Sequence, residues 1–144
     1  MRRPRRELPP AGVYHVTTRG VARAAIFLAD DERRFFLRLL AAEVARHDWR
    51  CHAFCLMTTH YHLVVETVLW RLSDGMHRLN GGYALDFNRR HRRNGHLFGD
   101  RFAAWVPRDE RHLHATVDYV LQNPVRAGLC DQAELWPWSA SAAA

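Results

Sequence analysis

The sequence predicts an α+β protein of ferredoxin-like type, with an antiparallel sheet and helices packed on one face of it. Apolar residues alternate with a period of two in four segments and recur at helical spacing in three others, in the order strand, helix, strand, strand, helix, strand, helix. The 144 residues suit a single domain, and they contain no internal repeat. We expect this domain at residues 12–139, between a flexible basic arm at residues 1–11 and a tail at residues 140–144.

The expected strands are runs of β-forming residues that end at turn signals. In the second strand, every second side chain from Trp49 to Met57 is expected on one side of the sheet. In the last strand, Gly99-Asp100 interrupts the run and Pro107 ends it. The expected strands are residues 12–18, 49–57, 61–67 and 96–106.

The first two expected helices carry an apolar stripe and begin at polar capping residues. The first starts at Asp30-Asp31, and the second starts at residues 72–74 and runs toward Asn88. Gly81-Gly82 inside the second helix costs about 1 kcal/mol per glycine relative to alanine. We therefore expect a close packing contact or a local break at these glycines.

The composition indicates a partner with many negative charges. The net charge is +6, and all 21 basic residues are arginines, whose planar guanidinium groups bind phosphates through paired hydrogen bonds. A GC-rich genome would explain the use of arginine alone, but the positive surface is the same in either case. No apolar run is long enough to span a membrane, no signal peptide is recognisable, and the three cysteines form no Cys-x-x-Cys pair. We expect a cytoplasmic protein without membrane association, a disulfide framework or a thiolate zinc site.

The strand at residues 61–67 follows directly on a histidine pair, His60 and His62. Alternation places both imidazoles on one face, with Cα atoms about 6.6 Å apart at a rise of roughly 3.3 Å per residue, close enough to bind one divalent ion. A second such pair, His112 and His114, falls in the third helix, where residues two apart point in different directions. The alternative for His60 and His62 is a pair of surface imidazoles.

The third expected helix is capped by Asp109 and ends near Asn123, because Pro124 cannot continue it. Tyr119 and Asn123 stand one turn apart on the face beside its apolar stripe. An ion held by two imidazoles and an amide oxygen leaves positions open for phosphate oxygens and stabilises the phenolate that Tyr119 needs to attack phosphorus. Such an attack leaves a phosphotyrosine and a free 3′ hydroxyl. The alternative is a tyrosine that only packs on the core.

Arginines in three places are candidates for contacts with the phosphates of a nucleic acid. Residues 89–95 hold four arginines and a histidine between ordered elements, so we favour a phosphate-contacting loop over a solvated charge run. Two further candidates lie beside the first and the last strand. The candidate residues are Arg19, Arg89, Arg90, Arg92, Arg93 and Arg101.

Four segments of the chain resemble the HUH single-tyrosine transposases, and most of all the branch of REP-associated tyrosine transposases. They contain the histidine pair, Tyr119 and Asn123, they stand in the order of that family, and they lie between about Val13 and Ser139. Two positions differ from the usual pattern, since Tyr61 replaces an aliphatic residue and Thr58-Thr59 replaces a common Pro-Asn. The similar segments are residues 14–20, 56–64, 87–91 and 119–129.

The resemblance implies a metal-dependent enzyme that nicks and rejoins single-stranded DNA beside small hairpins, with Mg²⁺ or Mn²⁺ as cofactor. It implies that His60 and His62 bind the metal, that Asn123 is the third ligand and that Tyr119 is the nucleophile. Gln122 is a reserve for the third ligand, because relatives outside this branch use glutamine. Two other functions stay open: a hairpin-binding or single-strand-binding protein without turnover, and a histidine-metal hydrolase that uses water as nucleophile. The chain is expected to be a monomer or a homodimer.

Overall fold

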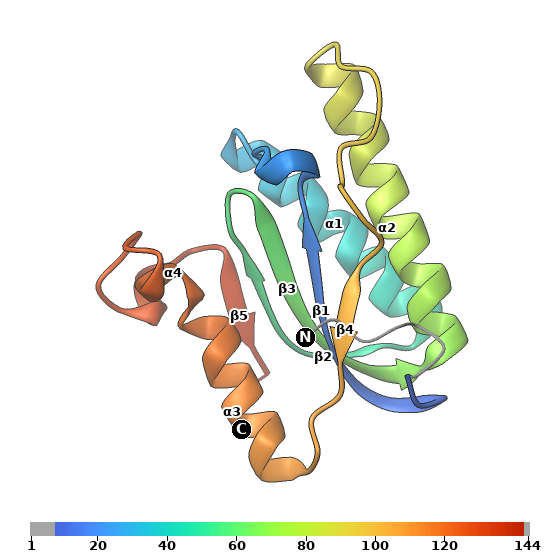
Figure 1. Ribbon diagram of the computed structural model, residues 1–144, viewed down its shortest axis with the longest axis vertical. Helices are drawn as coiled ribbons and strands as arrows, with labels where there is room; N and C mark the ends of the chain where they lie inside the picture. Colours follow the sequence, from blue (N-terminus) through green and yellow to red (C-terminus); the bar gives the residue numbers. More distant parts are fainter. Residues whose placement is uncertain (1–7, 143–144) are drawn as a thin grey trace.

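The computed structural model describes residues 8–142, which form one five-stranded antiparallel sheet with helices packed on it (Figure 1). The strand order is β4-β1-β3-β2-β5, and its first four strands have the ferredoxin-like order, so the predicted fold class is confirmed. The expected basic arm falls mostly on residues 1–7, outside the described residues. The elements are β1 (Ala11–Arg19), η2 (Val21–Arg23), α1 (Asp30–His47), β2 (Arg50–Leu56), β3 (His60–Val68), α2 (Leu69–Arg90), β4 (Ala103–Trp105), α3 (Glu110–Leu121), α4 (Asn123–Arg126), η3 (Ala133–Leu135) and β5 (Ser139–Ser141).

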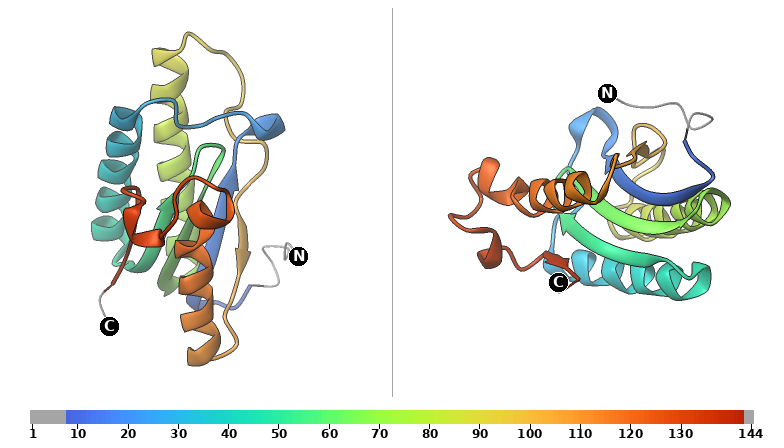
Figure 2. Two further views of the ribbon diagram at one scale, coloured as in Figure 1. Left: turned by 90° about the vertical axis from the view of Figure 1, so that its left-hand side faces the viewer. Right: turned by 90° about the horizontal axis from the view of Figure 1, so that it is seen from below.

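The sheet separates two layers of helices (Figure 2). Helices α1 and α2 pack on one face over the main core, which contains the large buried side chains Phe36, Tyr61 and Tyr83. Helix α3 covers the opposite face, where Val120 packs against Val64 in a smaller core. The prediction that the helices share one face was wrong for α3. The centre of the sheet is apolar on both faces, so both faces need a helical cover.

Strand β3 is the centre of the sheet and pairs with β1 on one side and β2 on the other. Its predicted alternation is confirmed, because Tyr61, Leu63 and Val65 belong to the main core and Val64 to the smaller one. The hydroxyl of Tyr61 donates a hydrogen bond of 2.5 Å to Oδ1 of Asn80 in α2. This contact ties one face of β3 to the α1 and α2 layer.

Strand β2 contains a β-bulge that the sequence did not predict. The pairing with β3 shifts between Cys51 and Ala53, so His52 is an extra residue in the ladder. An extra residue reverses the alternation beyond it. Cys51 consequently packs against the main core, whereas Ala53 lies in the smaller core. The prediction that every second side chain from Trp49 to Met57 shares one side was wrong.

The two edge strands differ from the prediction. Strand β4 has 3 residues and covers only part of the predicted strand at 96–106. Residues 97–99 instead form an isolated bridge with residues 19–21, in which Gly99 N–H donates to the Arg19 oxygen and Val21 N–H donates to the Leu97 oxygen. Strand β5 was not predicted; it pairs with β2 and continues into the segment expected as a tail. Serine and alanine have little strand preference, so the strand depends on the edge that β2 offers.

The helix starts also differ from the prediction. Ala29 is the N-cap of α1, and the carboxylate of Glu32 accepts hydrogen bonds from the backbone N–H groups of Leu28 and Ala29 at 2.7 and 3.1 Å. Helix α2 begins at Leu69, before the capping residues predicted at 72–74. It runs unbroken through Gly81-Gly82, neither of which makes a close contact, so that expectation was wrong too.

The start of α3 is as predicted, because Oδ1 of Asp109 accepts the backbone N–H of His112 at 2.8 Å. The helix ends at Leu121, and Pro124 then stands in the first turn of α4, where a missing N–H breaks no hydrogen bond. None of the helices in residues 8–142 has the length and apolar character that crossing a membrane requires.

Gly75 and Gly81 in α2 offer a matched test of this packing. A Cβ atom on Gly75 would lie 2.2 Å from the indole of Trp49, whereas one on Gly81 meets nothing within 4 Å. We expect Gly75→Ala to lower the free energy of unfolding by about 1–3 kcal/mol through overpacking and Gly81→Ala to raise it by up to about 1 kcal/mol through helix propensity. Urea unfolding measures both, and equal effects would contradict the packing at Trp49.

Candidate active site

The histidine pair lies on the face of β3 that α3 covers. The ring centroids of His60 and His62 are 5.1 Å apart. Nδ1 of His60 lies 3.2 Å from Oγ1 of Thr59, and Nδ1 of His62 lies 3.0 Å from Oγ1 of Thr17 in β1. These contacts orient both rings through Nδ1, so Nε2 of each ring is the nitrogen that a metal ion would take.

The surroundings of these rings favour neutral imidazoles. Burial, followed by the charges of His15, His60, Arg19 and Arg126, lowers the pKa of His62 to about 2. Burial and then Arg19 lower the pKa of His60 to about 4, and burial lowers the pKa of His15 to about 4. The neutral imidazole is the form that binds a metal ion.

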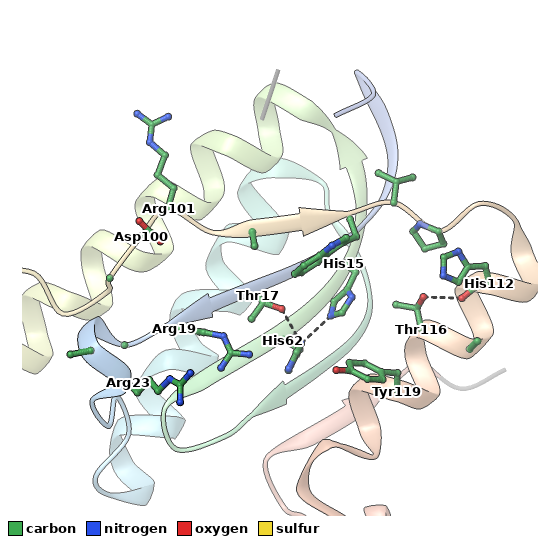
Figure 3. A pocket seen from close by; sticks show the side chains of 18 residues that line it. His15, Thr17, Arg19, Arg23, His62, Asp100, Arg101, His112, Thr116 and Tyr119 are labelled. Carbon is green, nitrogen blue, oxygen red and sulfur yellow. Dashed lines mark hydrogen bonds between the residues drawn. The ribbon is translucent and has the colours of Figure 1, made fainter. Parts of the chain in front are cut away.

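Helix α3 brings Tyr119 to the histidine pair. The side chain of Val120 is fully buried in the smaller core, which fixes the rotation of the helix. The ring centroid of Tyr119 lies 6.3 Å from that of His62 and 6.2 Å from that of His15, and its hydroxyl points toward His62 (Figure 3). Tyr119 remains 52% exposed. The phenol therefore lies beside His62 and is open to solvent.

Asn123 lies one turn after Tyr119, at the start of α4. Its Nδ2 donates to the carbonyl oxygens of Tyr119 and Val120 at 3.4 and 3.5 Å, so Oδ1 is the atom that can act as a ligand. Gln122 is exposed and caps the end of α3. Residues 8–142 contain no group of three His, Cys, Asp or Glu side chains that suits a metal ion. An ion on the histidine pair would need amide, water or substrate oxygens to complete its shell.

Arg126 contacts Tyr119, and the sequence analysis missed it. Its guanidinium carbon lies 4.1 Å from the centre of the Tyr119 ring, and Nη2 donates to the backbone oxygen of Tyr119 at 2.6 Å. The charge of Arg126 also lowers the pKa of His62, so one positive group acts on both Tyr119 and His62. The turn between α3 and α4 creates these contacts, and no helical periodicity signals them.

An open cavity of about 1160 Å³ extends from Tyr119 along β1 and the segment before α3 (Figure 3). Arg19 and Arg101, both predicted to contact DNA, line it, and so does Arg23, which was not predicted. Asp100 is the only acidic side chain among the described residues that line it. A positive cavity with aromatic walls suits a single strand, because phosphates attract cations and bases stack on aromatic rings.

The arginines at the end of α2 do not line this cavity. Arg90 forms ion pairs with Asp86 and Asp31 at 2.8 and 3.2 Å. Arg93 donates to Oδ1 of Asn88 at 2.6 Å. Two of these arginines are thus engaged by contacts within the protein. None of the four that were predicted to contact phosphates lines the cavity: Arg89, Arg90, Arg92 and Arg93.

Two solved structures share this fold. The structure of a REP-associated tyrosine transposase bound to a REP hairpin covers 96% of this chain and 82% of its own, with a TM-score of 0.72 and 18% identity. A putative transposase from Deinococcus radiodurans R1 covers 85% of this chain and 97% of its own, with a TM-score of 0.55 and 16% identity. At 18% and 16% identity the likeness shows the fold alone, so this chain has the fold of these two transposases.

The sequence itself defines the family. The model of the family described as "Transposase IS200 like" matches residues 11–123, which include the histidine pair and Tyr119. The chain belongs to the IS200-like transposases. A comparison with curated proteins finds no significant match.

The contact between Arg126 and Tyr119 can be tested without DNA. Three of the 4 tyrosines are buried, so 3-fluorotyrosine labelling gives one resonance from an exposed ring, which Tyr119→Phe assigns. We expect Arg126→Met to shift and narrow this ¹⁹F resonance, because the ring loses its cation–π partner, and to cost less than about 1 kcal/mol of stability. Arg101→Met is the control. A resonance that Arg126→Met leaves unchanged would contradict the contact.

Proposed function

We propose that this transposase is a metal-dependent endonuclease and strand transferase that acts on single-stranded DNA. The observation that supports the proposal most is that Tyr119 and His62 lie together in the wall of an arginine-lined cavity, with His60 beside His62. A phenol, two neutral imidazoles and several guanidinium groups together suit phosphoryl transfer, which depends on a positioned nucleophile and on charge stabilisation.

Mg²⁺ or Mn²⁺ is the proposed cofactor. The groups that would hold it are Nε2 of His60, Nε2 of His62 and Oδ1 of Asn123. When bound, such an ion polarises the scissile phosphate and offsets its negative charge. Thr17 and Thr59 contact the Nδ1 atoms of the two rings, which leaves both Nε2 atoms available to the ion.

Tyr119 is the proposed nucleophile. Its hydroxyl oxygen attacks the phosphorus of a phosphodiester, a bond from phosphorus to the tyrosine oxygen forms, and the bond from phosphorus to the 3′ oxygen breaks. The phenol proton passes to solvent and the 3′ oxygen takes up a proton, so the products are a 5′-phosphotyrosine and a free 3′ hydroxyl. Because the phosphoester is conserved, a 3′ hydroxyl can attack it and rejoin a strand. The charge of Arg126 beside the ring stabilises the phenolate that then departs.

DNA that carries a hairpin is the proposed substrate. One structure of the same fold is that of a transposase bound to a REP hairpin. The single strand beside the hairpin would enter the cavity, where Arg19, Arg23 and Arg101 neutralise its phosphates.

A trapping experiment tests the nucleophile. The protein is incubated with Mn²⁺ and an oligonucleotide that has single-stranded flanks beside a hairpin, and covalent products are separated under denaturing conditions. We expect a protein–DNA adduct with the wild type. In Tyr119→Phe we expect cleavage to fall by about 1000-fold or more, because the variant lacks only the attacking oxygen. Hairpin binding should persist in the variant.

Other outcomes of this experiment select other functions. Cleavage that survives Tyr119→Phe would make water the nucleophile and contradict the proposal. Salt-sensitive hairpin binding with no adduct in the wild type would identify a binding protein without turnover.

Salt dependence tests the path of the strand. Each lost phosphate contact lowers the log–log salt slope for single-stranded DNA by about 0.7. We expect this decrease for Arg19→Ala and for Arg101→Ala, because both side chains line the cavity. Arg38→Ala removes the same charge from an exposed position on α1, across the sheet from the cavity, and should leave the slope unchanged. Fluorescence anisotropy at several salt concentrations measures the slopes; equal slopes would place the strand elsewhere.

A further inference from the structure

His15 is a third histidine at the site, and the proposed reaction gives it no role. It lies in β1 opposite Val64 of β3, two positions along the ladder from the pair of Thr17 and His62, and therefore on the same face of the sheet. Nε2 of His15 lies 3.0 Å from Nδ1 of His62, and the two rings meet edge to edge, with centroids 5.2 Å apart and an interplanar angle of 29° (Figure 3). His15 therefore contacts His62 at the ring nitrogen opposite the one that would bind a metal.

Neighbouring elements confine the His15 ring. Its centroid lies 5.3 Å from that of Trp105 in β4 and 6.2 Å from that of Tyr119 in α3. His15 and Trp105 are also paired in the sheet. The ring is held by two strands and a helix, so its nitrogen stays directed at His62.

The contact between the two ring nitrogens accommodates one proton, because two facing N–H groups repel each other and so do two facing lone pairs. If His15 donates, the proton of a neutral His62 sits on Nε2, and no lone pair is left there for a metal. If His62 donates, its Nε2 keeps the lone pair that a ligand needs. The direction of one hydrogen bond thus decides whether His62 can bind a metal.

We infer that His15 is a positioning residue: it accepts the Nδ1 proton of His62 and so holds Nε2 of His62 in the form that binds a metal. The inference rests on the proposed function of the histidine pair. Thr17 lies at the same distance of 3.0 Å from Nδ1 of His62, but a hydroxyl donates as readily as it accepts. An imidazole nitrogen is a stronger base than a hydroxyl oxygen, and Trp105 and Tyr119 hold the His15 ring with its Nε2 toward Nδ1 of His62.

NMR measures the tautomer in the metal-free, full-length protein. Long-range ¹H–¹⁵N spectra of histidine side chains distinguish Nδ1–H from Nε2–H, and His62→Gln assigns the signals. We expect His62 to be in the Nδ1–H form in the wild type. His15→Phe keeps an aromatic ring in the space of the imidazole but removes the acceptor, and it should give a mixture of both forms. Thr17→Val is the matched control and should leave the Nδ1–H form dominant.

Metal affinity gives a second measurement, from the EPR signal of free Mn²⁺. We expect His15→Phe to weaken Mn²⁺ binding about 10- to 100-fold. His15→Gln, whose side-chain oxygen can accept the same proton, should recover most of the affinity, and it keeps the test decisive if His15→Phe does not fold. His112→Phe alters another histidine of the cavity wall and should bind as the wild type does.

The outcomes separate this inference from the proposed function. An Nε2–H form of His62 in the wild type overturns the inference, and so does equal Mn²⁺ affinity in the wild type and both His15 variants. If the wild type shows the Nδ1–H form but binds no Mn²⁺, the metal site of the proposed function fails, while the hydrogen bond from His62 to His15 stands.

Discussion

The site depends on which face of β3 is buried under α1 and α2. Tyr61 is fully buried on that face, where its ring lies 4.6 Å from that of Phe36 and its hydroxyl donates to Asn80. A slip of one residue would place this phenol under α3 and force His60 and His62 into the apolar main core, so the register is strongly specified. The tyrosine between the two histidines therefore fixes the direction of both imidazoles, although it replaces an aliphatic residue that is usual at this position.

The other half of the site is attached through a much smaller core. The buried members of that core are Ala53, Cys55, Met57, Val64 and Val120. Segments with few buried apolar contacts open at a lower free-energy cost than a large core does. The histidine pair thus stands on the central strand of the sheet, whereas Tyr119 stands on a helix that this small core holds against the sheet. This division lets the phenol adjust to a strand while the imidazoles keep their orientation.

Features that depend on neighbouring residues were predictable from the sequence: the order of the elements, the alternation at the histidine pair and the cap at Asp109. Features that depend on distant pairing were not. The bulge at His52 exists because β2 must match β3, and the contact of Arg126 with Tyr119 exists because α4 turns back on α3. His15 belongs to both groups, since its strand was predictable, but the register that brings it to His62 is set by the assembled sheet.

The arginines show why charge density along the sequence does not locate a binding surface. Residues 89–95, in the last turn of α2 and just after it, were expected to be a basic loop between ordered elements, yet Arg90 is paired with two aspartates and Arg93 is bonded to a neighbouring amide. The partner of a paired charge cancels most of its field, and salt screens what remains beyond about one Debye length, roughly 10 Å at 0.1 M salt. Arg19 and Arg101 are far apart in sequence, but the end of β1 and the segment before β4 bring them to one cavity with a single acidic neighbour among its described lining residues. The attraction for phosphate near Tyr119 therefore follows from strand pairing and not from the number of arginines in a segment.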